Sequence, residues 1–527
     1  MSSPSAPSTP PVPPSLSSVV SPPAPSASEE RPGLVLRNAR VGLRGPLRHI
    51  LITGGRVAAV LDEPPGCTEI GDLTAGHTRG GAVEDVDLEG ATVLPGLWDA
   101  HVHSVQWAQA RRRIDLGGAR SAREAVELVL PHLRPSGPTS EVIMGYGFRD
   151  ALWADVPDRS LLPEAHPVVL ISNDLHTAWL SGAALALIGR GDHPTGVLRE
   201  SECYNALVAL PPPPRELLDR WVAESTVAAA RIGVTGMLDF ELADNVTDWL
   251  RRFREQEVAV RVACSIPRSG LDEAIAHGLR TGDAVAGSGG WLEVGPVKMF
   301  VDGSLNTRTA YCDDPYPGSG ERGRLETPPD ELAAIMEHAA RHGLHPAVHA
   351  IGDLASSIAL DAFERVGCPG RIEHAQLVRA GDFARFARPG LVAGVQPAHA
   401  PDDREVADTH WCGRTARAFA YADLLAAGAT LELGSDAPVA PLDPWDGIAS
   451  AVTRTDDERP PWHPEQVISL QDALAAASRG RSAVWEGEPA DLMILERDPS
   501  LLAPGELRRP SVLGTLVGGR WTHRTVG

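Results

Sequence analysis

Two histidines separated by one residue stand in the stretch "DAHVHS", at positions 101 and 103. The stretch ends a short apolar run, a pattern that predicts a β-strand. Residues i and i+2 of a strand project from the same side, so both imidazoles can face one point. Imidazole nitrogens are ligands for Zn²⁺ and similar divalent ions. The pair alone is a weak signal, because the chain holds 18 histidines.

Three more residues of the same chemistry follow other apolar runs. His349 lies in "VHAIGD", His374 in "IEHAQ" and Asp436 in "LGSDAP". Any one of these histidines alone would be read as a hydrogen-bonded core or surface group. Four imidazoles and a carboxylate together form a donor set that suits a divalent metal ion, so the joint pattern predicts a metal centre.

Lys298, in "GPVKMFVDGS", is the only lysine of the chain. A buried lysine loses charge stabilisation, so its pKa falls and the neutral amine becomes accessible. That amine can add CO₂ to form a carbamate, an anionic ligand with two oxygens that can bridge two metal ions. Arginine stays protonated and cannot do this. A Schiff-base lysine also needs a lowered pKa, but it gives no reason for the histidines and Asp436; a purely structural lysine is the third alternative.

Eight short apolar runs between residues 91 and 438 carry these side chains, and amphipathic patterns such as "ELAAIMEHAARHG" and "DFARFARPG" separate many of them. Alternating strands and helices predict an α/β fold, a (β/α)8 TIM barrel. The carboxyl ends of barrel strands line the active-site mouth. Six side chains from predicted strands 1, 4, 5, 6 and 8 therefore converge there: His101, His103, Lys298, His349, His374 and Asp436.

The gap between the first two runs is too long for one crossover helix. Residues 105–230 contain strand and helix patterns of their own, which predict an insertion over the barrel mouth. Trp153 and His176 of this insertion are candidate substrate-binding residues, with plain packing as the alternative for the tryptophan. Asp302 and Arg308 are further candidates, with a structural ion pair as their alternative.

The segments outside the barrel (residues 96–484) have a different sequence pattern. Short β-branched runs over residues 33–95 and 485–527 predict one small β-sandwich built from both chain ends. Residues 1–32 are rich in Pro, Ser and Ala, which predicts a disordered tail.

Composition limits the classes of partner. The net charge of −21 argues against binding of nucleic acid and of anionic membranes. No apolar run has the length of a bilayer span, and the N-terminus does not read as a secretory signal. Six scattered cysteines without a CxxC pair are typical of free thiols, so a cytoplasmic location is predicted. The sequence leaves open whether the chain forms a homo-oligomer.

Five stretches together resemble the amidohydrolase superfamily: "LPGLWDAHVHS", "KMFVDGSLNTRTA", "HAIGD", "RIEHAQL" and "GSDAPV". They resemble in particular its amidohydrolase-3 branch, the YtcJ-like metal-dependent hydrolases. The resemblance runs from about residue 33 to the C-terminus, and it implies a (β/α)8 barrel with a small β-sandwich. It departs from the family pattern only in "AAASRGRSAVWEGEPADLMIL", which lacks most of the run that usually follows the barrel.

The resemblance also implies roles. His101, His103, His349, His374 and Asp436 match ligands of a divalent metal, with two Zn²⁺ ions bridged by a carboxylated Lys298, and Asp353 could orient a histidine. The implied activity is hydrolysis of a non-peptide C–N bond, of amide or N-substituted formamide type, in a small molecule. Asp436 would be both ligand and proton shuttle. The alternatives are a lysine Schiff-base enzyme and a catalytically silent barrel. The sequence does not name the substrate.

Overall fold

The computed structural model describes residues 33–64, 83–133, 141–150, 153–172, 177–199 and 201–526. The predicted tail over residues 1–32 lies outside this range. The chain divides into two compact units. The first combines the residues up to Ser104 with those from Thr226 onward, and the second spans Val105–Ser225.

The first unit contains a barrel of eight parallel strands. These strands are β6 (Leu97–Val102), β12 (Val234–Asp239), β13 (Arg261–Pro267), β14 (Leu292–Phe300), β15 (Pro346–Ala350), β16 (Gly370–His374), β17 (Leu391–Val395) and β18 (Thr430–Leu433). Each strand pairs with the next one in this order. A parallel bridge between Val102 and Ala437 joins the end of the last strand to the first. The eight predicted runs and the predicted barrel are confirmed.

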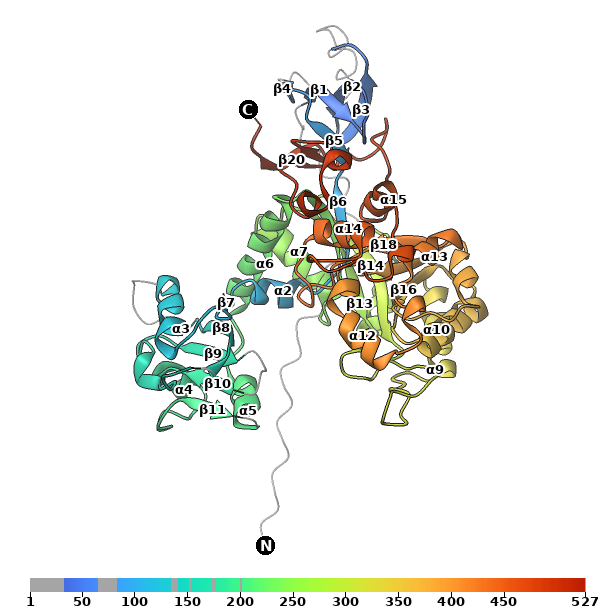
Figure 1. Ribbon diagram of the computed structural model, residues 1–527. Coiled ribbons are helices and arrows are strands. Elements are labelled where there is room, and N and C mark those ends of the chain that lie inside the picture. Colours follow the sequence, from blue (N-terminus) through green and yellow to red (C-terminus); the bar gives the residue numbers. More distant parts are fainter. Residues whose placement is uncertain are drawn as a thin grey trace. The chain divides into compact units, whose positions relative to one another are not determined.

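Helices alternate with the barrel strands (Figure 1). The longer ones are α6 (Arg215–Ala230), α7 (Asn245–Glu255), α9 (Pro329–Arg341), α10 (Asp353–Val366) and α14 (Pro444–Thr453). One expected helix differs. "DFARFARPG" forms only a short 3₁₀ helix, Phe383–Ala387. Pro389 disfavours helical geometry at Arg388, which is extended, so the helix cannot continue.

Strands from both chain ends share one sheet in the first unit (Figure 1, blue and red). The sheet joins β1 (Leu34–Val41), β2 (Leu47–Thr53), β3 (Arg56–Leu61), β4 (Glu84–Asp87), β5 (Thr92–Pro95), β19 (Leu492–Leu495), β20 (Val512–Val517) and β21 (Arg520–Arg524). The central contact is antiparallel pairing of β5 with β19. Buried side chains from both ends, including Val93, Leu492 and Ile494, form one apolar cluster.

The chain passes from this sheet into the barrel at Gly96. The apolar run expected as the first barrel strand is therefore two strands, β5 and β6. A side chain at position 96 has no room, because an added Cβ would lie 2.1 Å from Cγ2 of Thr235 on β12. Because it has no side chain, Gly96 lets the chain pass close to β12 between the end of β5 and the start of β6.

The second unit is built around a five-stranded sheet. Its order is β11 (Val197–Arg199), β10 (Thr177–Leu180), β9 (Val168–Ser172), β8 (Ile143–Phe148) and β7 (Ile114–Asp115). Trp179 and Phe148 are fully buried in its core beside helix α3 (Ala122–Val129). None of the helices in the described ranges has the length and apolarity needed to cross a bilayer.

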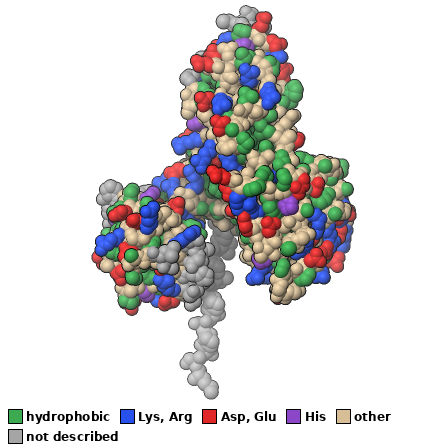
Figure 2. Space-filling model, viewed as in Figure 1, with side chains coloured by type: hydrophobic (Ala, Val, Ile, Leu, Met, Phe, Trp, Pro, Cys, Tyr) green, Lys and Arg blue, Asp and Glu red, His purple; other side chains and the backbone are tan. Residues whose placement is uncertain are grey.

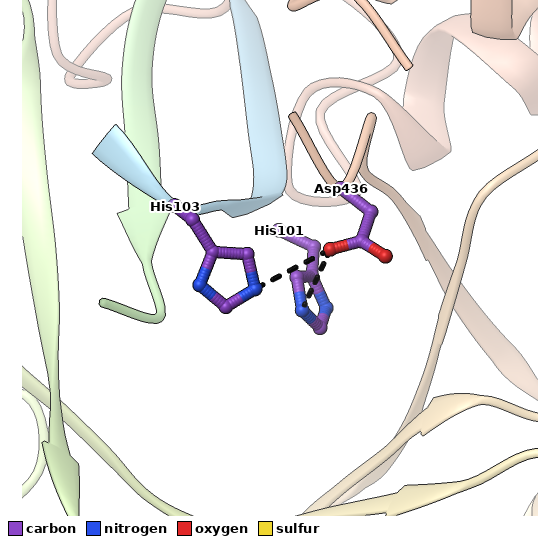
Figure 3. A group of neighbouring side chains, drawn as sticks. All are labelled: His101, His103 and Asp436. Carbon is purple, nitrogen blue, oxygen red and sulfur yellow. Dashed lines mark ion pairs between the residues drawn. The ribbon is translucent and has the colours of Figure 1, made fainter. Parts of the chain in front are cut away.

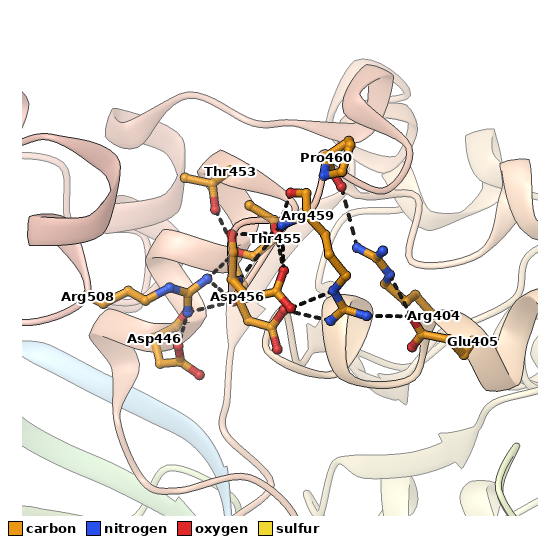
Figure 4. A network of polar contacts seen from close by, with 11 residues as sticks. Arg404, Glu405, Asp446, Thr453, Thr455, Asp456, Arg459, Pro460 and Arg508 are labelled. Atoms are coloured by element: carbon orange, nitrogen blue, oxygen red, sulfur yellow. Dashed lines mark hydrogen bonds and ion pairs between the residues drawn. The ribbon is translucent and has the colours of Figure 1, made fainter.

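A polar network holds the segment that follows α14 (Figure 4). The guanidinium of Arg508 bonds the carboxylate of Asp446 and the backbone oxygen of Thr455. Arg459 pairs with Glu405 of helix α12 (Arg404–His410). Single exposed ion pairs stabilise little, but a connected set restrains the loops it joins. Here it restrains the segment after α14 against α14 itself and against α12.

Candidate metal centre

The ends of the first and last barrel strands are tied together by backbone hydrogen bonds. Asp436 N–H donates to His101 O at 2.7 Å, and His103 N–H donates to Ala437 O at 2.8 Å. These bonds bring three side chains to one point (Figure 3). Oδ1 of Asp436 lies 3.6 Å from Nε2 of His101 and 3.4 Å from Nε2 of His103.

Lys298 reaches the same point from β14. Its Nζ lies 3.3 Å from Nε2 of His101, and its side chain is 1% exposed. The rings of Phe240 and Phe300 lie 4.4 Å and 5.3 Å from Nζ. Burial lowers the pKa of Lys298 to about 8. The neutral amine is therefore accessible near neutral pH, as the sequence predicted.

His349 and His374 complete the group from β15 and β16. Their ring centres lie 4.4 Å apart, and that of His374 lies 4.9 Å from that of His101. His349 Nε2 lies 3.0 Å from Gly303 O, and His374 Nδ1 lies 2.9 Å from Oε1 of Gln396. One nitrogen of each ring is thereby engaged as a donor, which leaves Nδ1 of His349 and Nε2 of His374 as lone-pair ligands.

Electrostatics set the protonation states that a metal ligand needs. Burial, and then the charge of Lys298, lower the pKa of His101 to about 4 and that of His349 to about 3. Burial also lowers the pKa of His374 well below its usual value. Burial alone would raise the pKa of Asp436, but His101 and His103 hold it well below its ordinary range. The imidazoles of His101, His349 and His374 are therefore neutral, and Asp436 is ionised, near pH 7.

These residues fit a divalent metal ion. Within the described ranges, one ring nitrogen each of His101 and His103 and one oxygen of Asp436 lie within 4.8 Å of one another. Nδ1 of His103 is buried and has no hydrogen-bond partner among the described residues. Neutral imidazoles with an ionised carboxylate are a zinc-type donor set. Lys298 and His374 lie next to His101, and His349 lies next to His374.

Two of these residues have unusual backbone geometry. His374 has φ 76° and Asp436 has φ 57°. The left-handed region costs a non-glycine residue about 1–3 kcal/mol and is found often at functional sites. In both cases the turn comes directly at the end of a barrel strand, where it directs the side chain toward the other ligands.

Some contacts at the centre were not foreseen. Oε2 of Glu373 lies 2.7 Å from Nδ1 of His101. Gln396, which contacts His374, follows β17, a strand for which the sequence predicted no functional residue. The signals were in the sequence: Glu373 precedes His374 in "RIEHAQL", and Gln396 lies in "GLVAGVQPAHA". A pattern shows which residues are near a strand end but not which side chain meets which ligand.

Two residues near Lys298 and His349 make contacts that the sequence did not predict. Asp302 is 1% exposed and accepts hydrogen bonds from the backbone N–H groups of Tyr311, Ile351 and Gly352. These contacts agree with a structural role for its carboxylate, and its role in substrate binding stays a prediction. Asp353 accepts the N–H of Asp313 and approaches Arg417, and therefore does not orient a histidine.

The other substrate-binding candidates remain predictions. Arg308 is exposed and forms no ion pair with Asp302 in the described part of the chain. Trp153 belongs to the second unit, where its indole donates to Ala119 O at 3.1 Å and packs on Phe148. These contacts agree with the packing alternative for Trp153. His176 lies outside the described residues.

Similarity to known proteins agrees with this geometry. Residues 84–523 match the amidohydrolase family. The chain is 30% identical over 497 residues to the protein LONG AFTER FAR-RED 3 of Arabidopsis thaliana, covering 84% of each chain. It is 26% identical over 493 residues to the putative amidohydrolase YtcJ of Bacillus subtilis (83% of this chain, 90% of YtcJ). It is 27% identical over 537 residues to the N-substituted formamide deformylase of Arthrobacter pascens (91% and 95%).

A solved structure supports the same relationship. The crystal structure of an uncharacterized metal-dependent hydrolase from Pyrococcus horikoshii superposes with a TM-score of 0.72 at 26% identity. The match covers 90% of this chain and 99% of that one. The resemblance in the strand-end stretches thus extends over the barrel and the terminal sheet together, and the chain belongs to the amidohydrolase family.

Proposed function

We propose that this amidohydrolase cleaves a non-peptide C–N bond in a small molecule of the amide or N-substituted formamide type. The observation that carries the proposal is the convergence of Asp436 with Lys298 and His101 at the mouth of the barrel. Similarity to an N-substituted formamide deformylase supports the choice of bond.

The same residues would hold the metal. We propose two zinc ions, with His101, His103 and Asp436 on one side and His349 and His374 on the other. Addition of CO₂ to the neutral Nζ of Lys298 forms one N–C bond and releases one proton, which leaves an anionic carbamate between the two sets. Divalent ions held there would lower the pKa of water to about 7 and polarise a carbonyl oxygen.

The chain's own contribution to the reaction is the handling of a proton. Asp436 is ionised at neutral pH, so its carboxylate can accept a proton from the attacking water. It can then donate that proton to the nitrogen of the leaving amine. A neutral amine is a far better leaving group than an amide anion, which is why an amidohydrolase needs such a shuttle.

The test combines metal analysis with a substrate panel. Formamides, amides, lactams and ureas are incubated with zinc-loaded protein, and released amine is measured. We expect about two equivalents of metal and hydrolysis of at least one class, with Asp436→Asn as the inactive control. Protein without metal that is trapped by borohydride with a carbonyl compound would favour the lysine Schiff-base alternative. Neither metal nor trapping would favour a catalytically silent barrel.

The proposal also covers the cellular location of the protein and the type of substrate. The cysteines at positions 264, 312, 368 and 412 are free thiols in the described part of the chain. This supports a reducing compartment, and we propose the cytoplasm. On the face shown in Figure 2, acidic and basic side chains are interspersed rather than gathered in a basic stripe. Such a surface supports a small-molecule substrate over nucleic acid.

A further inference from the structure

A buried carboxylate lies behind the metal centre. Glu373, the last residue but one of β16, is fully buried, and its Oε2 lies 2.7 Å from Nδ1 of His101. Both side chains are essentially closed to solvent, with exposures of 0% and 1%. A contact of this length between buried groups is a strong hydrogen bond.

The contacts on the two ring nitrogens of His101 define its tautomer. Glu373 forms a buried ion pair with Arg371, whose Nε lies 2.6 Å from Oε1, and a guanidinium partner of this kind keeps a carboxylate ionised. An ionised carboxylate can only accept, so Nδ1 carries the proton. On the other side, Nζ of Lys298 can donate to Nε2 at 3.3 Å. Nε2 is therefore the lone-pair nitrogen, and it is the one that faces Asp436.

The carboxylate is itself held in place. Nε of Arg371 donates to Oε1 of Glu373 at 2.6 Å, and the other end of the guanidinium pairs with Glu432 on β18. Gly394 on β17 provides the space: an added Cβ there would lie 2.3 Å from Oε2 of Glu373. Glu373, Arg371 and Gly394 thus form a fitted cradle inside the barrel.

The other imidazoles have different partners. Nδ1 of His374 meets the neutral amide oxygen of Gln396, and Nε2 of His349 meets the backbone oxygen of Gly303. Nδ1 of His103 has no partner in the described chain. Of these ring contacts, only that of His101 is a hydrogen bond to a carboxylate.

We propose that Glu373 is the positioning residue for His101. It fixes the ring with Nε2 toward the ion, and its negative charge makes that nitrogen a stronger ligand. Partners of this kind typically change metal affinity by about 10–100-fold. The inference rests on the proposed metal site but does not depend on any substrate.

Zinc affinity, measured by competition with a chromophoric chelator, tests the proposal. Glu373→Gln keeps the shape and removes the charge, and we expect zinc to bind about 10–100-fold more weakly. Glu432→Gln is the matched control: it removes a carboxylate from the same arginine but does not touch His101, so affinity should stay close to wild type. Equal losses in the two variants would overturn the proposal, because the effect would then belong to the ion-pair network.

Three further variants keep the proposal testable if Glu373→Gln does not fold. Gly394→Ala leaves Glu373 in the chain but pushes its carboxylate from His101, so it should also weaken zinc binding. Glu373→Asp keeps the charge on a shorter arm and should retain more affinity than Glu373→Ala. Wild-type zinc affinity in both Gly394→Ala and Glu373→Ala would refute the role of Glu373.

The tautomer of His101 is a second measurement. It should not change in the Glu373 variants if Glu373 had only a structural role. In zinc-free protein labelled with ¹⁵N-histidine, the ring signals of His101 are assigned by their loss in His101→Asn. We expect the Nδ1–H tautomer in the wild type and a mixture of tautomers in Glu373→Ala. The Nε2–H tautomer in the wild type would overturn the proposal. Neither readout uses a substrate, so a protein that hydrolyses no amide would count against the proposed function alone.

Discussion

Nζ of Lys298 lies 3.3 Å from Nε2 of His101, so the only lysine of the chain meets an imidazole of the first barrel strand. Two aromatic rings and the barrel wall exclude water around it. An amine with its pKa lowered to about 8 in such a place is reactive rather than merely cationic.

Substitutions of Lys298 should distinguish a role of its positive charge from a role of its carbamate. Lys298→Arg keeps the charge but cannot form a carbamate, so we expect no detectable turnover. Lys298→Ala should lose bound metal, and added short-chain carboxylates such as acetate should restore part of the activity. Metal content by elemental analysis is the deciding measurement: a Lys298→Ala protein that keeps two tightly bound ions would exclude the carbamate.

Bicarbonate should matter for the wild-type protein. After metal and CO₂ are both removed, activity should return faster with zinc plus bicarbonate than with zinc alone. The rate of return should rise with pH toward about 8, where half of the Lys298 amine is neutral. Equal rates with and without bicarbonate at every pH would contradict this.

Asp436→Asn tests the proton shuttle. The amide keeps the shape and one ligand oxygen but cannot accept a proton from water. We expect kcat to fall by roughly 10²–10⁴-fold, the usual scale of general acid–base catalysis, while most of the metal is retained. Turnover within a few-fold of wild type would remove Asp436 from the mechanism.

The free energy of unfolding of the metal-free protein should depend on pH in a defined window. The pKa values of His101 (about 4) and His349 (about 3) lie below the unfolded value of 6.5. At these two imidazoles the unfolded chain binds more protons than the folded one between these limits, so their contribution to stability falls as pH falls. Burial raises the pKa of Asp99 and of Asp302 to about 7, so these two carboxyl groups contribute in the opposite direction over the same range. Each group adds a slope of up to about 1.4 kcal/mol per pH unit.

Urea unfolding at a series of pH values checks this expectation. The comparison is with a His101→Asn, His349→Asn double variant, in which Asp99 and Asp302 are kept. From pH 6.5 toward pH 4 the wild type should lose stability relative to this variant. A difference between the two proteins that stays constant between pH 4 and 6.5 would contradict the burial of neutral imidazoles.

Truncation after residue 484 should damage the terminal sheet. It removes β19, β20 and β21, leaves β5 without its antiparallel partner and uncovers the apolar cluster around Val93. Exposed strand edges and apolar patches favour aggregation. Size-exclusion chromatography should find soluble aggregates or no soluble protein, whereas removal of Gly527 alone, which keeps Val526 against the apolar cluster, should have little effect. A monodisperse, active truncated protein would contradict this.

Much of the fold could be predicted because strand ends in a parallel barrel meet at one face. The eight apolar runs identified the eight strands, and the polar residues closing five of them identified the side chains that converge. The failures were local. "DFARFARPG" contains a helical pattern, but the proline after Arg388 stops it after a short 3₁₀ helix. The apolar run around Gly96 predicted one strand, because its pattern does not show that the chain passes there from the terminal sheet (β5) into the barrel (β6).

The contacts behind the ligands could not be predicted for a different reason. The contacts of Asp302, Glu373 and Gln396 depend on how the neighbouring strands and loops pack, which spacing along the chain does not give. His374 and Asp436 lie in the left-handed region, where the alternation of a strand no longer holds. Spacing made Asp302 a candidate for substrate binding, whereas in the structure its carboxylate accepts hydrogen bonds from three backbone N–H groups.

The bonds that join β6 to the end of β18 also set an order of events in biosynthesis. Ser435 N–H donates to Asp99 across 336 residues of chain, next to the bond between Asp436 and His101. Contacts of such long sequence separation are slow to form. His101 and His103 leave the ribosome long before Asp436 exists, so the three ligands can meet only when the last strand docks. We therefore expect zinc to be captured by the finished barrel rather than by the nascent chain, and its uptake to report that folding is complete.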